Sequence, residues 1–406
     1  MTMSLRQYFS LRADTVAIPA LDGLRGIAIL MVVAYHGTEA FAPTGAGLLP
    51  VGPWDLATPI YSGWMGVNLF FVLSGFLITY HLLRRWTRVP DGAGLRTYLV
   101  KRWLRIVPTY YVVLAIAAAG VVPHHPIDTN LLSLQVAWHA LFLQDYLPSS
   151  ILGPFWSLGV EEKFYLLMPL VLLVAWRLAT NGRAIALLAG IAALPLAIRL
   201  AMWMSGIGQE PGVYIQVWRN PFHLNLDALF LGALAAWVVV HRHALRVPGA
   251  AAAWSMRAGI AVLSLIVLAA AFPGSHSRVL YQVLIVPLSA LGMAGVVLGT
   301  ALAPRGRLRV LEGRWLARAG KLAYPWYLTH VLIMWWAWGD LQVVWPGIVE
   351  LAPAVQFGVF LPLYLASSVL TALLVHFAVE KPFLILKDRV GVHSPSVVQV
   401  STLPAA

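Results

Sequence analysis

The chain has 406 residues, of which 60% are hydrophobic and only 11% are Asp, Glu, Lys or Arg. Soluble domains usually carry about 25% charged residues, and with a mean hydropathy of +0.78 a soluble fold could not bury so much apolar surface. We therefore predict a multi-spanning membrane protein. The chain contains no cysteine, which excludes disulfides, thiol nucleophiles, iron–sulfur clusters and cysteine-ligated zinc.

The predicted elements are apolar helices. The first twenty residues lack a long apolar core, and we interpret them as a short internal tail, not a cleaved signal peptide. Ten apolar segments follow, several of them near the short end of the range for a helix that crosses a hydrocarbon core about 30 Å thick. The predicted fold class is an all-α integral membrane protein with about ten transmembrane helices. The predicted spans are 24–42, 63–83, 106–123, 156–176, 184–204, 222–240, 258–272, 280–303, 322–338 and 356–378.

The distribution of basic residues predicts the topology. If both termini are cytoplasmic, all but four of the 28 lysines and arginines fall on the cytoplasmic side. The exceptions are Lys163 and Arg199 within spans, and Arg219 and Arg278 in outer loops. This asymmetry satisfies the positive-inside rule. We attribute the net charge of +12 mainly to topology, with attraction to anionic lipid or phosphate as a second contribution. We predict a multi-pass protein of the plasma (inner) membrane.

We predict one membrane domain over residues 1–389 and a disordered C-terminal tail over 390–406. The longest stretch without a predicted span is 124–155, which holds an apolar segment at 131–147. Counting that segment as an eleventh span would place two later basic loops outside. We therefore expect a surface or re-entrant helix there. No internal repeat stands out, which disfavours the transporter folds that are built from repeats.

Ionisable side chains inside spans are functional hypotheses, because an Arg, Lys or Asp at the membrane centre costs about 2.5–3.5 kcal/mol. Arg25 and His36 are eleven residues apart, so in a helix they share one face about 16 Å apart. A histidine near mid-membrane can shuttle protons; the alternative is a neutral histidine bonded to another helix. The ionisable residues within or at the edges of spans are Arg25, His36, Glu161, Glu162, Lys163, Arg199, Asp227, His330 and His376.

Ser157 and Glu161 are four residues apart and share a helix face. A hydroxyl and a carboxylate on one stripe could orient a base or bind a sugar hydroxyl. The alternative is an interfacial pair, because this span enters from the outer side and Glu161 lies only about one to one and a half turns down. Lys163 is expected to pair with an adjacent acid.

Arg102 and Arg105 lie one turn apart at the inner mouth of the third span. With Arg25 they form an inner cluster suited to phosphates, since guanidinium groups bind phosphates in a bidentate manner. The alternative is that these arginines only keep their loop on the cytoplasmic side, as the positive-inside rule describes.

Two further segments combine small or polar residues with bulky ones. Gly66, Ser74 and Gly75 permit close helix approach or the passage of a thin substrate. Tyr327 and His330 are three residues apart on one helix face near mid-membrane. Packing alone would explain both patterns.

Taken together, six stretches resemble the acyltransferase family 3 membrane proteins, in order, over residues 18–384. The Arg–ten–His, Arg-x-x-Arg and Ser-x-x-x-Glu spacings are part of this resemblance. Members transfer acyl groups, usually acetyl, to hydroxyls of glycans, lipid-linked saccharides or secondary metabolites, commonly from cytoplasmic acyl-CoA. The matching stretches are LDGLRGIAILMVVAYH, FFVLSGFLIT, RWLR, WSLGVEEKFYLLMP, YPWYLTH and VEKPF.

The resemblance implies a role for several residues, and the sequence departs from the family pattern at others. Lys163 stands where the family often has Gln, and Gly159 where it often has Ser. Asn225 stands where many members have Arg, which leaves the role of Asp227 open. The soluble hydrolase-like domain of some relatives is not expected. The implied roles are catalytic for His36, Arg25 and Glu161, donor-binding for Arg102, Arg105, Ser74 and Gly75, and acceptor-binding or orienting for Ser157, Tyr327 and His330.

The resulting hypothesis is an integral-membrane O-acyltransferase of the O-acetyltransferase type. The arginines would hold the phosphates of acyl-CoA, a co-substrate and not a permanent cofactor, and no metal is expected. His36 would act as general base, or would carry the acyl group itself. The expected partners are acyl-CoA, a hydroxyl-bearing glycan, lipid or small-molecule acceptor and membrane lipid, without nucleic acid. The alternatives are a saccharide flippase or exporter with a proton relay through His36 and Glu161, and, more weakly, a sensor without turnover.

Overall fold

The structure is a computed structural model of the chain. It describes residues 18–40, 47–52, 54–86, 92–147, 149–178, 180–208, 212–271 and 280–390, together with positions 8, 9, 11 and 210. The predicted C-terminal tail lies outside these residues, apart from Val390, as does most of the predicted N-terminal tail.

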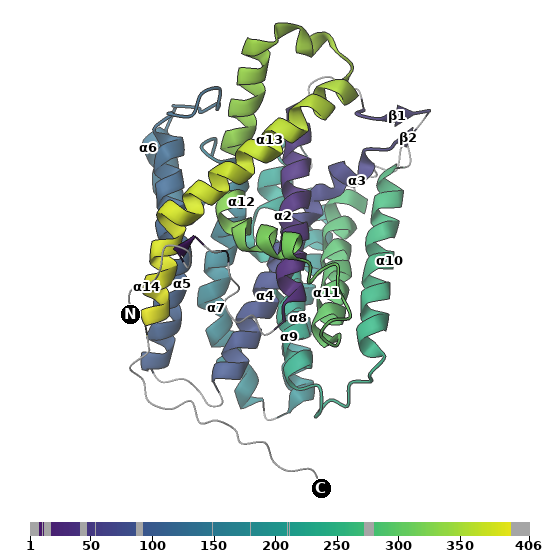
Figure 1. The fold of residues 1–406 in the computed structure, drawn as a ribbon. Helices are drawn as coiled ribbons and strands as arrows, with labels where there is room; N and C mark the ends of the chain where they lie inside the picture. The colour runs from purple at the N-terminus through teal and green to yellow at the C-terminus, as the bar shows by residue number, and fades with distance from the viewer. Residues whose placement is uncertain are drawn as a thin grey trace.

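The described chain is almost entirely helical (Figure 1). The α-helices are α2 (Ala20–Glu39), α3 (Thr58–Tyr61), α4 (Met65–Arg85), α5 (Gly92–Ala118), α6 (Leu132–Ala140), α7 (Trp156–Arg177), α8 (Asn181–Met204), α9 (Leu226–Val240), α10 (Ala251–Ala271), α11 (Val286–Leu302), α12 (Arg314–Val344), α13 (Pro353–Val375) and α14 (Lys381–Arg389). Short 3₁₀ or π turns are η2 (Ser62–Trp64), η3 (Gly153–Phe155), η4 (Ile215–Arg219), η5 (Phe222–Leu224), η6 (Leu280–Ile285), η7 (Pro346–Glu350) and η8 (His376–Glu380). Strands β1 (Pro50–Val51) and β2 (Trp54–Asp55) form an antiparallel pair.

The long helices run side by side as a bundle, and α13 crosses it diagonally (Figure 1). The closest pairs are α4 with α9, α2 with α12, and α10 with α11. At the α4–α9 crossing the backbones touch: a Cβ added to Gly75 would collide with the Leu229 carbonyl, and one added to Gly232 with the Val72 carbonyl. Small residues at a crossing allow this approach.

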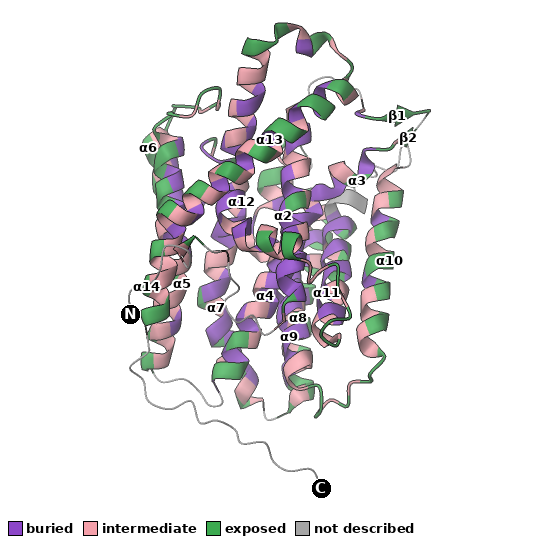
Figure 2. Cartoon of the chain, in the orientation of Figure 1, coloured by how far each residue is buried: buried purple, intermediate pink, exposed green. Residues whose placement is uncertain are grey.

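The interior of the bundle is formed by α2, α4 and α9, whereas α10 is largely exposed (Figure 2). The exposed side chains of α10 include Trp254, Ile260, Leu265 and Leu268. Large apolar side chains that face outward along a whole helix are typical of a surface in contact with lipid.

The all-α prediction is confirmed, and each of the ten predicted spans overlaps an α-helix, of which α9, with 15 residues, is the shortest. Among the described residues, six helical stretches are long and apolar enough by themselves to cross a membrane. Helix α6 has only nine residues, about 14 Å of helix, and is too short to cross. This agrees with its prediction as a surface or re-entrant helix. Ten spans and cytoplasmic termini stay predictions.

Candidate active site

A cavity in the middle of the bundle brings together most of the predicted site residues. It has an empty volume of about 860 Å³ and is bounded by α2, α4, α5, α7 and α12. Along α4 its lining runs from Val67 to Ile78, a rise of about 16 Å along the helix. It is therefore elongated along the bundle axis. We call it the central cavity. The predicted site residues that line it are Arg25, Ser74, Arg102, Arg105, Ser157, Glu161 and Tyr327.

One end of the central cavity is strongly basic. Arg25, Arg102 and Arg105 converge there from α2 and α5. Within the described residues, Asp22 is the only carboxylate that forms an ion pair with any of the three, at 3.7 Å from Arg25. The Arg102 guanidinium lies 5.4 Å from the centre of the Tyr165 ring. The excess of positive charge over carboxylate makes this end suited to an anion such as phosphate.

A carboxylate lies in the middle of the cavity. Glu161 accepts hydrogen bonds from the Ser74 hydroxyl at 2.6 Å and from the Tyr165 hydroxyl at 3.0 Å. The predicted partner of Glu161, Ser157, does not bond to it. Instead the Ser157 hydroxyl contacts the Tyr327 hydroxyl at 2.7 Å, and Tyr327 also donates to the Pro154 carbonyl at 2.8 Å.

Tyr165 is a site residue that the sequence analysis missed. Its spacing of four residues from Glu161 was the available signal, because residues at i and i+4 lie on one helix face.

His36 and His330 pair just beyond the other end of the cavity. Nδ1 of His36 lies 2.8 Å from the Val32 carbonyl, and Nδ1 of His330 lies 2.7 Å from the Tyr327 carbonyl. A carbonyl oxygen can only accept, so Nδ1 carries the proton in both rings. Nε2 of His330 then accepts from Nδ1–H of His36 at 3.3 Å. This leaves Nε2 of His36 with its lone pair available as a base.

Tyr327 connects the histidine pair to the cavity. Its ring lies 5.4 Å from the His330 ring and 6.1 Å from the Phe70 ring, and both Tyr327 and Phe70 line the cavity. His36 and His330 are not part of that lining. The pair therefore lies one layer of side chains beyond the end of the cavity.

Both glycines of the predicted donor path lie elsewhere. Gly75 faces the backbone of α9, and Gly66 faces α2, where an added Cβ would approach the Ala28 carbonyl at 2.6 Å. Of the predicted trio, only Ser74 lines the central cavity.

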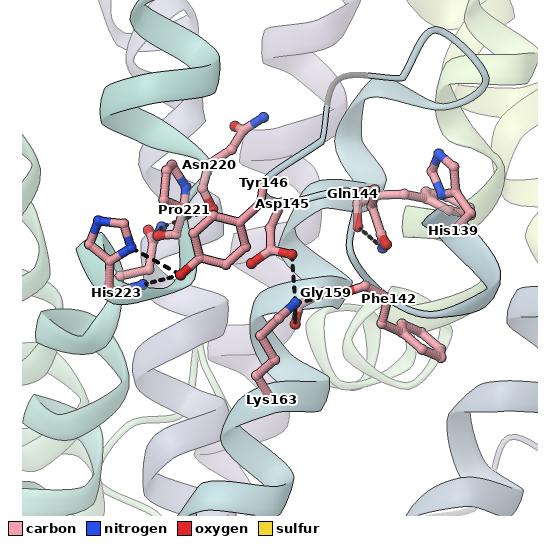
Figure 3. Close-up of polar contacts among 12 residues, drawn as sticks. His139, Phe142, Gln144, Asp145, Tyr146, Gly159, Lys163, Asn220, Pro221 and His223 are labelled. Carbon is pink, nitrogen blue, oxygen red and sulfur yellow. Dashed lines mark hydrogen bonds and ion pairs between the residues drawn. The ribbon is translucent and has the colours of Figure 1, made fainter. Parts of the chain in front are cut away.

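A second polar cluster ties the 141–147 segment to α7 (Figure 3). The Lys163 ammonium donates to the Asp145 carboxylate at 2.6 Å and to the Gly159 carbonyl at 3.2 Å. The expected pairing of Lys163 with an adjacent acid is therefore wrong: its partner lies 18 residues earlier in the chain. Beside it, the Tyr146 hydroxyl contacts Nδ1 of His223 at 2.9 Å.

A buried arginine complements Asn225. Arg219 donates to the Asn225 side chain at 2.9 Å and to the Asn68 side chain at 2.8 Å, and its guanidinium lies 4.8 Å from the centre of the Trp156 ring. Arg219 is thus a structural partner that the sequence analysis did not assign. Its signal was its position in a predicted outer loop, against the positive-inside rule.

The sequence profile described as the acyltransferase domain matches residues 18–376. The chain belongs to this acyltransferase family. The match covers every residue of the central cavity and both histidines of the pair.

Several curated proteins are similar to the chain. The peptidoglycan O-acetyltransferase OatA of Listeria monocytogenes is 28% identical over 348 residues, which cover 82% of this chain and 51% of that protein. The putative peptidoglycan O-acetyltransferase YrhL of Bacillus subtilis is 27% identical over 220 residues, which cover 51% of this chain and 32% of that protein. The chain thus spans about half or less of the length of these relatives. No solved structure matches it.

Proposed function

We propose that this protein is a membrane O-acetyltransferase that moves an acetyl group from acetyl-CoA to a hydroxyl of a glycan. The proposal rests on three features that follow one another through the bundle. A basic end with three arginines opens into an elongated cavity, and that cavity ends one side-chain layer from a histidine whose Nε2 is available as a base. Family membership and the names of its relatives support the reaction type. The acyltransferase domain comprises residues 1–389, in the plasma membrane with both termini cytoplasmic.

Acetyl-CoA enters the cavity with its narrow acetyl-pantetheine arm first. Arg25, Arg102 and Arg105 hold the phosphates of acetyl-CoA at the cytoplasmic face, because guanidinium groups bind phosphate oxygens strongly. The pantetheine arm runs along the cavity past Ser74 and Glu161. The thioester then reaches His36 when the layer formed by Phe70 and Tyr327 opens.

His36 acts as the general base. Its Nε2 takes the proton from the acceptor hydroxyl while the hydroxyl oxygen attacks the thioester carbonyl carbon. The C–O bond forms, the C–S bond breaks, and the proton passes to the departing CoA sulfur. Holding both substrates in line in a cavity without bulk water accounts for much of the acceleration. In the two-step variant, His36 carries the acetyl group itself before passing it on.

The acceptor meets the protein on the outer side, where the relatives' names suggest a peptidoglycan saccharide. Ser157 and Tyr327 are the hydroxyl-bearing side chains at that end of the cavity, and they orient the acceptor hydroxyl.

The first test is a turnover assay with the purified full chain in detergent and acetyl-labelled CoA, with and without muropeptides. Free CoA, labelled glycan and protein-bound label are all measured. We expect glycan acetylation by the wild type and none by His36→Ala. Hydroxylamine-labile label on the protein would indicate the two-step route.

The matched control is His241→Ala. Nδ1 of His241 also lies near the carbonyl four residues earlier, at 3.0 Å from the Trp237 oxygen, but His241 does not line the cavity. Turnover in His36→Ala equal to that of the control would disprove the assignment of the base. Folded wild type that neither binds acetyl-CoA nor releases CoA would disprove the proposed function itself.

A further inference from the structure

Two cavities that the proposed reaction does not use lie between α2 and α11. The first has an empty volume of about 1430 Å³ and lies where α2 begins and where α4, α9 and α11 end. Its lining includes Tyr80, Arg84, Arg242, Thr300 and Arg305, and we call it the basic recess. The second has an empty volume of about 1360 Å³ and lies between α2, α4, α10 and α11. Its lining includes Leu24, Met31, Met65, Met256, Met293 and Val296, and we call it the apolar groove.

The two spaces follow one another along α2 and α11. On α2, Ala20 lines the basic recess, whereas Leu24, Ile27 and Met31 line the apolar groove. Steps of four, three and four residues place all of them on one stripe of the helix. One stripe of α11 continues from one space to the other in the same way, through Met293, Val296 and Thr300. A molecule that lies along these stripes would therefore occupy both.

The basic recess has the chemistry of an anion site. Arg84, Arg242 and Arg305 are exposed at its mouth. The carboxylate that shares this lining, Glu312, already accepts two hydrogen bonds from the Gly306 N–H, at 3.0 and 3.1 Å. Positive-inside retention explains why arginines gather at this end of the bundle. It does not explain the recess behind them.

One residue of the recess lining, Thr300, carries a buried hydroxyl without a described partner. Thr300 is 1% exposed and lines the recess, yet its hydroxyl has no hydrogen-bond partner among the described residues. Buried polar groups are normally paired, because an unpaired one loses its bonds to water without replacement. An oxygen-rich group in the recess would supply the missing partner.

The apolar groove has the chemistry of a hydrocarbon site. Its lining is aliphatic apart from Ser62 and Ser264. Water is poorly held in such a space, because it needs two to four polar partners. Four of the lining residues are methionines, whose flexible thioether side chains adapt to an irregular guest. Helix α10, which forms the outer wall, packs mainly on α11 at the edge of the bundle (Figure 1).

We propose that the basic recess and the apolar groove together bind an anionic glycerophospholipid. The phosphate lies among Arg84, Arg242 and Arg305, the Thr300 hydroxyl donates to an oxygen of the phosphoglycerol group, and an acyl chain fills the apolar groove. Anionic lipids are enriched on the cytoplasmic leaflet, on the side where basic loops collect. This site is separate from the central cavity and does not depend on the proposed function.

The test is lipid titration by native mass spectrometry on the delipidated full chain in detergent. The probes are dioleoyl phosphatidylglycerol and dioleoyl phosphatidylcholine, which share the same chains and differ in net charge. We expect the anionic lipid to bind at least tenfold more tightly. The triple variant Arg84→Gln, Arg242→Gln, Arg305→Gln should abolish this preference.

The matched control removes three other exposed arginines from the segment that joins α11 to the start of α12, Arg307→Gln, Arg309→Gln and Arg314→Gln. These residues do not line the recess. The control should keep the preference. An equal loss in both triple variants would show that general positive charge attracts the lipid, and would overturn the proposal.

A single substitution tests the buried hydroxyl. Thr300→Val keeps the shape of the side chain and removes an oxygen that has no described partner in the lipid-free protein. The unfolding temperature without lipid should therefore stay the same or rise, while phosphatidylglycerol affinity falls severalfold. Unchanged affinity would remove Thr300 from the site.

Two further arms separate the possible ligands. Val296→Phe narrows the groove and should weaken lipid binding. Inorganic phosphate alone should bind far more weakly than the lipid. Phosphate binding as tight as that of the lipid, displacement of the lipid by acetyl-CoA, or equal affinity for the two lipids would each overturn the proposal.

Discussion

His36 of α2 and His330 of α12 face one another across 294 residues of sequence, with 3.3 Å between Nδ1 of His36 and Nε2 of His330. Their ring centres are 4.8 Å apart and the ring planes meet at 70°. The Val32 and Tyr327 carbonyls fix the proton on Nδ1 of each ring. His330 is fully buried, whereas His36 is half-buried. The Val32 carbonyl thus sets the tautomer that a base requires, and the buried His330 ring accepts a second, longer contact from the same N–H and orients the His36 ring.

His330 is a positioning residue in this arrangement, and His330→Phe should separate positioning from substrate binding. Phe fills the same space but cannot accept the hydrogen bond from Nδ1–H of His36. We expect kcat to fall about tenfold to a hundredfold, a part of the 10²–10⁴ that general base catalysis contributes. KM for acetyl-CoA should change little. Steady-state kinetics over a pH series provide the measurement.

His330→Gln is the conservative comparison, because its amide oxygen can still accept that hydrogen bond. We expect it to recover much of the activity and of the pH profile. A rise in KM with kcat unchanged in both variants would instead place His330 in contact with a substrate.

Helices and shared helix faces could be predicted from the sequence, because both depend on the order of residues along one helix. The Arg25–His36 spacing is of this kind, and both residues lie on α2. Contacts between helices could not be predicted. The Ser74–Glu161 and Lys163–Asp145 bonds depend on how α4, α7 and the 141–147 segment pack, and similar apolar surfaces allow many packings.

The composition of the segment around Gly75 did not show which element this glycine contacts. The pair Ser74–Gly75 suggested a path for a thin substrate, yet the two residues are neighbours in a helix and point in different directions. Ser74 lines the central cavity, whereas Gly75 meets the backbone of α9. A small residue allows a close approach, and only the neighbouring element shows what approaches.

The basic end of the central cavity predicts a charge-dependent donor affinity. Arg105→Gln removes a cationic group that lines the cavity, without the ring contacts that Arg102 makes with Tyr98 and Tyr165. We expect the Kd for acetyl-CoA to rise about tenfold or more, since a hydrogen bond to a charged group contributes about 1.5–3 kcal/mol. Raising the salt concentration should weaken wild-type binding more than binding by the variant.

Arg96→Gln is the control for this measurement. Arg96 is exposed on the same helix, α5, and does not line the cavity. Isothermal titration of each protein at low and high salt gives the comparison. If Arg105→Gln and Arg96→Gln bind the donor with the same Kd, the cavity arginines serve only topology.

The Lys163–Asp145 pair predicts a strong stability effect with a specific rescue. Asp145 is 1% exposed, and Lys163 is its only described ion-pair partner. Lys163→Met leaves that carboxylate buried without its cation, which costs about 3–5 kcal/mol when one member of a buried pair is removed. The unfolding temperature in detergent should fall sharply, and Asp145→Asn in the same chain should restore much of it.

A complete double-mutant cycle measures the coupling between the two residues. The four proteins are compared by their unfolding temperatures at one pH and one detergent concentration. Additive losses in the double variant would mean that the two side chains stabilise the fold independently, contrary to the contact in Figure 3.

His139 of α6 predicts how stability depends on pH. Burial lowers the pKa of His139 to about 4, below its ordinary value of 6.5. Its ring contacts the Tyr110 hydroxyl at 3.1 Å and the Ser149 hydroxyl at 2.9 Å, joining α6 to α5 and to the segment after α6. Between pH 6.5 and 4 the unfolded chain binds a proton that the folded protein does not. The free energy of unfolding therefore decreases as the pH is lowered through that window. At pH 5, His139 accounts for about 2 kcal/mol of this decrease.

His139→Gln keeps a donor and an acceptor at that position but does not titrate. Its unfolding temperature should fall less between pH 7 and pH 5 than that of the wild type. The control is His243→Gln, at an exposed position, whose unfolding temperature should change with pH as that of the wild type does. Parallel curves for all three proteins would show that His139 is protonated equally in the folded and unfolded states. The α5–α6 contact would then not be sensitive to pH.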